Sequence, residues 1–164
     1  MGDETSGASP RRSRPTTEES YGIPTHEDGM LSWEFVRRKM ASDETYWGTT
    51  TLPDGRPHAR PIWGVWIDDT FYCGGGEKTR WVRNLALRPE IVVHRESGTD
   101  VVIIEGTAER IDDETADEEL LERLDAAYEG KYGIQHGTPF FAVRPETVLA
   151  WSDYPEDATR WSFD

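Results

Sequence analysis

Seven arginine and lysine side chains between residues 56 and 95 stand out in this chain because together they could bind an anion. Only four carboxylates accompany them, so the segment has a net charge of +3, whereas the whole chain carries −14. Lys78, Thr79 and Arg80 lie at the start of a short predicted helix, and Arg60 lies on a strand rich in tryptophan. Guanidinium, hydroxyl and free amide groups at a helix N-terminus are good donors to a phosphate dianion. The segment therefore predicts a site for a flat ligand that carries a phosphate.

Other reactive residue types are too scattered along the sequence to indicate a metal or catalytic centre. The four histidines (His26, His58, His94 and His136) lack metal-ligand spacing, and we expect His94 to be a core residue. Cys73 is the single cysteine, so no intramolecular disulfide or cysteine-based zinc site is possible. The carboxylates from Asp112 to Glu129 are expected to form a solvated helix face. No metal site is predicted.

The overall composition limits the class of partner. The chain has 32 Asp and Glu residues but only three lysines among its 18 basic residues. An acidic surface with few lysines suggests adaptation to concentrated salt, where screening cancels self-repulsion. An ordinary acidic protein from a GC-rich genome that favours arginine codons is the alternative. In either case the negative surface repels phosphate backbones, so nucleic-acid binding is not expected.

The chain of 164 residues is long enough for one domain with a hydrophobic core. No apolar run approaches the roughly 20 residues that cross a bilayer, and the N-terminus lacks an apolar signal region. We therefore expect a cytoplasmic protein without membrane contact. Residues 1–28 are polar and rich in Gly, Ser, Thr and Pro, which predicts a disordered tail. The folded domain is expected to span residues 29–164.

The folded part reads mainly as strands. Patterns typical of strands cover residues 46–51, 58–67, 70–74, 91–95, 101–111, 140–143, 148–151 and 160–163. Helices are predicted after Ser32, from Lys78 or Thr79 to Leu87, and from Ala116 to about Glu129. We expect a mainly β fold with peripheral helices, a six- to seven-stranded antiparallel barrel that is closed or split.

The long acidic helix also has predicted ends. Thr115 and Glu118 fit a capping box at its start, and Gly130 is expected to stop it.

Several motifs in order resemble the pyridoxamine 5′-phosphate oxidase-like family. They are Asp54-Gly55-Arg56-Pro57, Arg60-Pro61-Ile62-Trp63-Gly64-Val65-Trp66, Thr79-Arg80-Trp81-Val82-Arg83-Asn84-Leu85 and the terminal Thr159-Arg160-Trp161-Ser162-Phe163. The resemblance spans roughly residues 46–164 and implies the FMN-binding split-barrel fold of that family.

The resemblance also implies a cofactor site. The strand with Arg60, Pro61, Ile62 and Trp63 would run along the isoalloxazine ring, with Arg60 near the phosphate. Thr79 and Arg80 would add phosphate contacts, with Asn84 as a further site residue. Trp81 stands where many members have a lysine, and Lys78 is a candidate substitute. Arg160 would close the site from the second subunit of a homodimer.

The implied function is that of an FMN-dependent oxidoreductase that transfers hydride or electrons to or from a small organic substrate. The alternatives are an F420-dependent reductase of the same fold and a non-catalytic flavin- or haem-binding protein. True pyridoxamine phosphate oxidase activity is a weaker interpretation, because recognition of a substrate phosphate is not evident.

Overall fold

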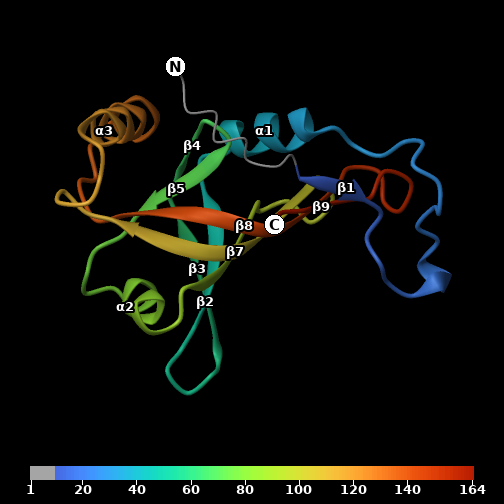
Figure 1. Ribbon diagram of the computed structural model, residues 1–164, viewed down its shortest axis with the longest axis horizontal. Helices are drawn as coiled ribbons and strands as arrows, with labels where there is room; N and C mark the ends of the chain where they lie inside the picture. Colours follow the sequence, from blue (N-terminus) through green and yellow to red (C-terminus); the bar gives the residue numbers. More distant parts are fainter. Residues whose placement is uncertain (1–9) are drawn as a thin grey trace.

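A computed structural model describes residues 10–164 and shows a curved antiparallel sheet flanked by helices (Figure 1). The strands are β1 (Arg11–Ser13), β2 (Tyr46–Thr51), β3 (Pro57–Ile62), β4 (Val65–Ile67), β5 (Thr70–Gly74), β6 (Glu90–His94), β7 (Val101–Ile111), β8 (Phe140–Trp151) and β9 (Thr159–Ser162). The helices are the single-turn η1 (Glu19–Tyr21), α1 (Trp33–Ser42), α2 (Arg80–Leu87) and α3 (Glu118–Tyr132). The expected mainly β class with peripheral helices is confirmed.

The sheet order is β1-β9-β8-β7-β6-β2-β3, with β4 paired to β5 and β5 paired to β8. Strand β8 is long enough to serve two neighbours on one side: Phe140–Val143 pair with β5, and Thr147–Ala150 pair with β9. Strand β3 pairs with β2 and with no other strand of the described chain, so the sheet is not closed. The fold is a split barrel, and it has nine strands within residues 10–164 instead of the expected six or seven.

One extra strand arises because the expected strand 58–67 is interrupted at Trp63 and Gly64. A Cβ atom at Gly64 would lie 2.2 Å from Cζ of Phe71, so only glycine fits this close approach. After Ile62 the chain no longer pairs with β2. It continues as β4, which pairs with β5 instead. The interruption leaves β3 as a free edge of the sheet.

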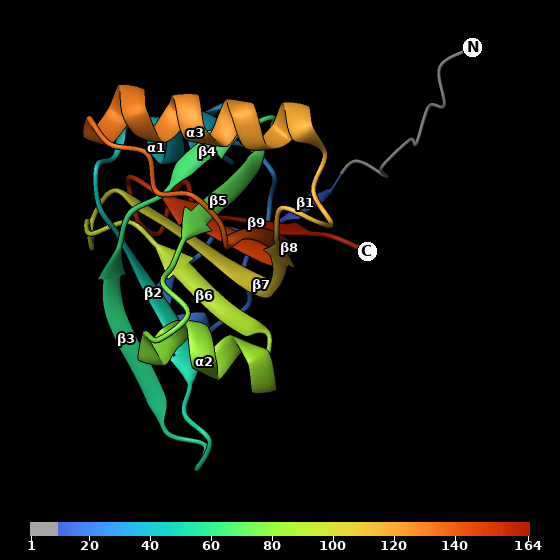
Figure 2. The same ribbon diagram turned by 90° about the vertical axis from the view of Figure 1, so that its left-hand side faces the viewer.

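Helices α1 and α3 lie at one end of the sheet, and α2 lies beside β2 toward the other end (Figure 2). Helix α3 starts and ends later than the sequence suggests. Its N-cap is Asp117, whose carboxylate accepts a hydrogen bond from the Glu119 amide at 3.3 Å, so the expected Thr115 capping box is wrong. Gly133 ends the helix with a φ of 77°, while Gly130 lies inside it.

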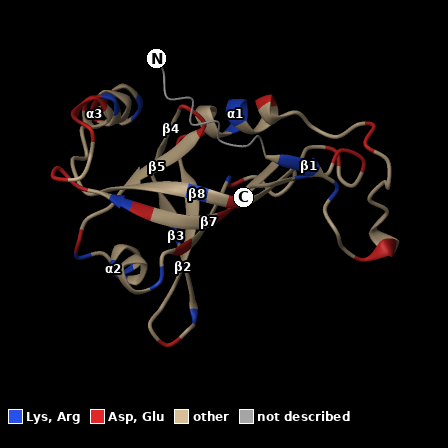
Figure 3. Cartoon of the chain, viewed as in Figure 1, with Lys and Arg blue, Asp and Glu red and all other residues tan. Residues whose placement is uncertain are grey.

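Acidic residues mark the outer surface of α3, whereas basic residues flank α2 (Figure 3). Within residues 10–164, no helix is long and apolar enough to cross a membrane.

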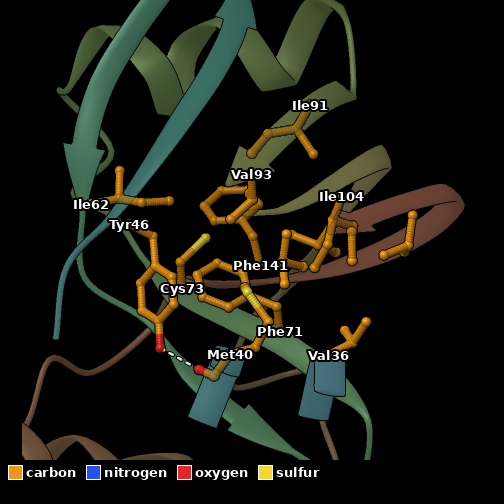
Figure 4. Close-up of a cluster of buried hydrophobic side chains, with 14 of the residues drawn as sticks. Val36, Met40, Tyr46, Ile62, Phe71, Cys73, Ile91, Val93, Ile104 and Phe141 are labelled. Atoms are coloured by element: carbon orange, nitrogen blue, oxygen red, sulfur yellow. Dashed lines mark hydrogen bonds between the residues drawn. The ribbon is translucent and has the colours of Figure 1, made fainter. Parts of the chain in front are cut away.

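The main hydrophobic core lies between the curved sheet and α1 (Figure 4). Val36 and Met40 of α1 are fully buried against it, as the helical spacing predicts. The Tyr46 hydroxyl donates to the Met40 carbonyl at 2.5 Å, which fixes the start of β2 under the end of α1. A second cluster lies beneath α3 and includes Leu124, Tyr128 and Phe140. The first cluster includes Tyr46, Ile62 and Val82 and thus holds β2, β3 and α2 in place around the candidate site.

Residues 10–28 differ from the expectation of a disordered tail. Strand β1 pairs with β9, and the Arg14 guanidinium donates to four backbone carbonyls, those of His26, Asp28, Glu156 and Ala158. This one side chain ties the segment to the loop before β9. The remaining part of the expected tail, residues 1–9, lies outside the described residues.

Candidate functional site

A chain of three polar side chains links β2 to the start of α2. The Nδ2 of Asn84 donates to Oγ1 of Thr50 at 3.0 Å, and both residues are buried. The Oδ1 of Asn84 accepts from Nε of Arg80 at 3.0 Å. Asn84 is fully buried, so it anchors Arg80 in one orientation and does not itself face a ligand. The sequence grouped Arg80 and Asn84 in one site, and the structure shows why they belong together.

His58 brings β3 into the same group. The register places His58 opposite Thr50 and Arg60 opposite Gly48, so His58 and Arg60 lie on the same face of β3. His58 is only 7% exposed, and its Nδ1 is buried without a hydrogen-bond partner among residues 10–164. Burial lowers the pKa of His58, and the nearby guanidiniums of Arg60 and Arg80 lower it further. Both arginines therefore lie close enough to act on this imidazole.

The N-terminus of α2 adds backbone donors at the same place. Thr79 is the N-cap residue, but its hydroxyl donates to the Gly76 carbonyl at 2.6 Å and does not cap the helix. The first helical hydrogen bond is that of the Arg83 amide to Thr79, at 3.1 Å. The amides of Arg80, Trp81 and Val82 are thus the unsatisfied donors of the first turn, where the helix dipole favours an anion.

The arginines of this group have no carboxylate partners within the described chain. The Arg60 Nη1 donates only to the Ala59 carbonyl at 2.8 Å, and Arg80 donates to the Asn84 amide oxygen. Glu77, the carboxylate nearest in sequence to Arg80, pairs instead with Arg110. We call His58, Arg60, Thr79, Arg80 and Asn84 the cationic cradle. Its donors suit a phosphate group, which needs several N–H donors and positive charge.

A rigid aromatic surface lies at the far end of β3. The Trp63 and Tyr132 rings stack in parallel with centroids 4.3 Å apart and planes 2° apart, and Trp63 is 45% exposed. The Tyr132 hydroxyl accepts from the Gly64 amide at 2.9 Å, and Lys131 Nζ donates to the Gly64 carbonyl at 2.7 Å. Burial lowers the pKa of Lys131 to about 8. Residues of α3 thus hold the Trp63–Gly64 interruption in place.

The remaining predicted residues of β3 and the loop before α2 fall in different environments. Pro61 is exposed and lies opposite Trp47 on the other face of the sheet from Arg60. Ile62 is 6% exposed and packs in the core, so a side-chain contact of Ile62 with a cofactor is excluded. Lys78 is exposed in the loop before α2 and has no ion pair in the described chain.

Trp81, at the position where the resemblance led us to expect a lysine, takes a structural role. Its ring packs against Phe141 with centroids 5.7 Å apart, and a Cβ atom at Gly75 would lie 2.4 Å from it. Trp81 therefore belongs to the edge of the core and offers the cradle only its backbone amide.

Arg160 lies on the opposite face of the sheet from Arg60. A row of half-buried side chains crosses that outward face through successive strand pairs, from Trp47 to His94, Ile103, Leu149 and Arg160. The Nε of Arg160 is buried without a hydrogen-bond partner in residues 10–164. Arg160 also lines a shallow hollow of about 250 Å³ with Glu105 and Thr147. Within one chain it does not join the cradle.

The cradle residues line neither of two further hollows, although Thr50, which accepts a hydrogen bond from Asn84, borders the smaller of the two. One of about 470 Å³ is lined by Trp33, Trp161 and Phe163, and one of about 320 Å³ lies over the outward faces of β2 and β6. The cradle is instead an open surface along the free edge of β3. No cluster of three potential metal ligands occurs within residues 10–164.

Sequence reasoning missed His58 and Thr50 as parts of the site, and it did not assign Lys131 and Tyr132 to the support of Gly64. His58 had one usable signal, its position two residues before Arg60, which places both on one strand face. The other three become neighbours of the site only through the packing of β2 and α3.

The family model described as "Pyridoxamine 5′-phosphate oxidase" matches residues 34–152, which include β2 to β8 and the cradle. The chain belongs to this family. The pyridoxamine 5′-phosphate oxidase resemblance expected from the sequence is thereby confirmed. None of the curated proteins compared with the chain matches it significantly.

Solved structures of low sequence identity share the fold. A conserved hypothetical protein from Mycobacterium tuberculosis has a TM-score of 0.65 at 20% identity, over 77% of this chain and 88% of that one. An FAD binding protein from Mycobacterium smegmatis has a TM-score of 0.56 at 20% identity, over 82% and 98% of the two chains. An F420 reductase has a TM-score of 0.50 at 18% identity, over 68% and 94%. These likenesses establish the split-barrel fold of this family member.

Proposed function

We propose that this protein binds FMN through the cationic cradle and acts as an oxidoreductase on a small organic substrate. The observation that carries the proposal is the pair of guanidiniums, Arg60 and Arg80, which flank His58 and lack carboxylate partners in residues 10–164. Arg80 is half-buried and Arg60 is exposed, and an anionic ligand would supply the opposite charge that both lack in so acidic a protein. The uncapped start of α2 supplies further donors for the same phosphate.

Each residue then has a defined task. Arg60 and Arg80 neutralise the phosphate, the first-turn amides of α2 donate to it, and Asn84 keeps Arg80 in position. The β3 backbone beyond Arg60 leads to Trp63, whose exposed ring offers an apolar surface for a flat ring system. When bound, FMN would supply hydride or electron transfer, while the protein supplies orientation and charge.

F420 is the alternative cofactor for the same cradle, because it also carries a phosphate and has in addition an anionic glutamate tail. Exposed arginines near the cradle, Arg56 and Arg83, would suit that tail. A flavin or haem carrier without turnover is the other alternative. The structural neighbours include an FAD binding protein, an F420 reductase and haem binding proteins, so the fold accommodates all three ligands.

We further propose a homodimer joined through the outward face of the sheet. The row of Trp47, His94, Ile103 and Leu149 on that face is half-buried and apolar except for His94, and Arg160 lies at its end. A second copy would cover these side chains and bring its own groups to the open edge of β3. Light scattering should show a dimer, and Leu149→Glu should yield a monomer with weakened cofactor retention. A wild-type monomer would contradict this arrangement.

The cofactor is tested first by identifying what the purified protein carries, from its visible spectrum and the mass of the released ligand. Apoprotein is then titrated with FMN and with riboflavin, which lacks the phosphate. Arg60→Ala and Arg80→Ala should each weaken FMN binding about 10- to 100-fold, since a hydrogen bond to a charged group contributes about 1.5–3 kcal/mol. Arg83→Ala, on the exposed side of α2, is the matched control.

The outcomes of these titrations distinguish the proposed cofactors and functions. Equal affinity for FMN and riboflavin in the wild type would contradict the phosphate cradle. Release of F420 or haem would replace FMN as the cofactor. Reduction of the bound flavin with no reoxidation by any organic acceptor tested would leave a carrier instead of an enzyme.

A further inference from the structure

His58 is the one member of the cationic cradle whose charge can change near neutral pH. Its ring is 7% exposed, and its Nδ1 is buried without a partner among residues 10–164. A buried ring nitrogen without a partner costs free energy, because desolvation is not repaid by a hydrogen bond. An arrangement of this kind is expected where a ligand completes the site.

The charges around His58 are of one sign. Arg60 follows it by two residues on the same face of β3, and Arg80 approaches from α2. Strand β2, which lies on its other side, carries no charged residue from Tyr46 to Thr51. Arg83 is the other cation of α2 and lies on the exposed side of that helix. No carboxylate contacts the cradle arginines within the described chain, so the charges beside an imidazolium at position 58, those of Arg60 and Arg80, repel it in the free protein.

A phosphate dianion between Arg60 and Arg80 reverses this field. Two negative charges would more than offset the repulsion, and they would act on the imidazole through space even without direct contact. We propose that His58 is a proton-accepting positioning residue of the cradle, which is neutral in the free protein and becomes protonated when a phosphate-bearing ligand binds. This inference rests on the proposed function, because it requires the cradle to be the phosphate site.

The depressed pKa of His58 in the free protein agrees with this coupling, since it leaves the ring neutral at pH 7. The sign of the pH effect follows from linkage. Between the free and bound pKa of His58, binding takes up a proton, so affinity falls as pH rises, by at most about tenfold per pH unit. Above the bound pKa, the effect ends.

The test uses FMN and riboflavin as matched probes with the full-length apoprotein. Calorimetric titration at pH 7 in buffers of different ionisation enthalpy gives the number of protons taken up. The FMN phosphate has a second pKa near 6, so measurements from pH 7 to 9 keep it mostly dianionic. We expect proton uptake with FMN and not with riboflavin. Because Lys131 near Trp63 titrates around pH 8, riboflavin also controls for protons exchanged at the ring end of the site.

Two variants identify the residue that takes up the proton. His58→Asn, which keeps a polar group at the Nδ1 position, should abolish the uptake and bind FMN at pH 7 as weakly as the wild type does at pH 9. His26→Asn, on the exposed segment before α1, should behave as the wild type. NMR titration of the wild-type histidine rings gives the same answer without depending on how the variant folds, since the pKa of His58 should rise when FMN is added.

Each result decides a separate claim. No proton uptake with FMN, uptake that persists in His58→Asn, or an unchanged His58 pKa would overturn the coupling and leave the FMN proposal intact. FMN and riboflavin that bind the wild type equally would contradict the cradle itself, and the coupling with it.

Discussion

Two groups of arginines in this protein have opposite surroundings. Arg95 donates to both carboxylate oxygens of Asp43, at 2.6 and 3.0 Å, and to Asp100 at 3.1 Å, while Lys39 also pairs with Asp100. The side chain of Arg95 is 12% exposed. In the cradle, by contrast, Arg60 and Arg80 donate to neutral oxygens alone within residues 10–164.

The difference separates structural arginines from those available to a ligand. Charges that leave water need opposite charges, and around Arg95 the protein itself provides them. Around Arg60 and Arg80 the opposite charge must come from outside the described chain. Residue type alone would not distinguish the two groups; Arg95 is also more buried, since its side chain is 12% exposed, whereas Arg80 is half-buried and Arg60 is exposed. The partners of each guanidinium make the distinction.

Removing Arg95 should give the largest change in stability. Arg95→Met leaves the Asp43 and Asp100 carboxylates without their main partner, and losing one side of a buried pair costs about 3–5 kcal/mol. Arg80→Met should cost less, about 1–3 kcal/mol, because it leaves the buried amide oxygen of Asn84 without its donor but strands no carboxylate. Chemical denaturation of both variants measures the contrast. Equal losses would mean that Arg80 has an unrecognised structural partner.

Asn84 supports both the fold and the candidate site, so its removal should affect both the stability and the affinity for FMN. Asn84→Ala leaves the buried Thr50 hydroxyl unpaired, at a cost of about 1–3 kcal/mol, and also frees Arg80 from its anchor. We therefore expect a loss of stability together with a severalfold weaker affinity for FMN. Arg83→Ala, one position before Asn84, is the matched control for both measurements. Full FMN affinity in Asn84→Ala would show that Arg80 needs no anchor.

The sequence selects Arg60, Thr79 and Arg80 as candidate site residues, whereas it leaves part of the surrounding fold unspecified. Arg60, Thr79 and Arg80 follow from a family pattern, because backbone geometry at a helix start and along one strand face is local. The interruption at Gly64 was not predictable, since it depends on how closely the Phe71 ring of the neighbouring strand β5 approaches the backbone, which residue types alone do not specify. Pairing of β1 with β9 likewise depends on partners about 150 residues apart.

The placement of Arg160 on the opposite sheet face from Arg60 shows the same limit. Which face Arg160 occupies depends on the register of β8 and β9, and composition contains no information on that register. His58 could have been inferred from strand alternation, but its burial against β2 could not.

Salt should act on the two groups differently. The Debye length falls from about 10 Å at 0.1 M salt to about 3 Å at 1 M, which screens an open site far more than a buried ion pair. FMN affinity should therefore fall as KCl rises, and Arg80→Ala should reduce that salt dependence. The free energy of unfolding should instead rise with KCl, because the chain carries a net charge of −14. A stability that is indifferent to salt would argue against the expected adaptation to concentrated salt.

Acid should weaken the Arg95 network, whereas alkali should weaken ligand binding at the cradle. Desolvation by itself would raise the pKa of Asp100, but hydrogen bonds from Lys39 and Arg95 outweigh it and lower the pKa below its ordinary value. The folded-state pKa of Asp100 is thus below the unfolded one, near 3.9. Its stabilising contribution is present above pH 4 and is lost as pH falls through the folded-state pKa.

Asp100→Asn tests this with the smallest expected change. At pH 7 the variant should be less stable than the wild type by about 1 kcal/mol. This difference in the free energy of unfolding should shrink as pH falls toward 3. At the cradle the direction is reversed, because the positive charge that binding requires at His58 is lost as pH rises. Unfolding and FMN titrations across pH 3 to 9 measure both on the same samples. A gap that stays constant with pH would mean that Asp100 contributes through its shape and hydrogen bonds instead of its charge.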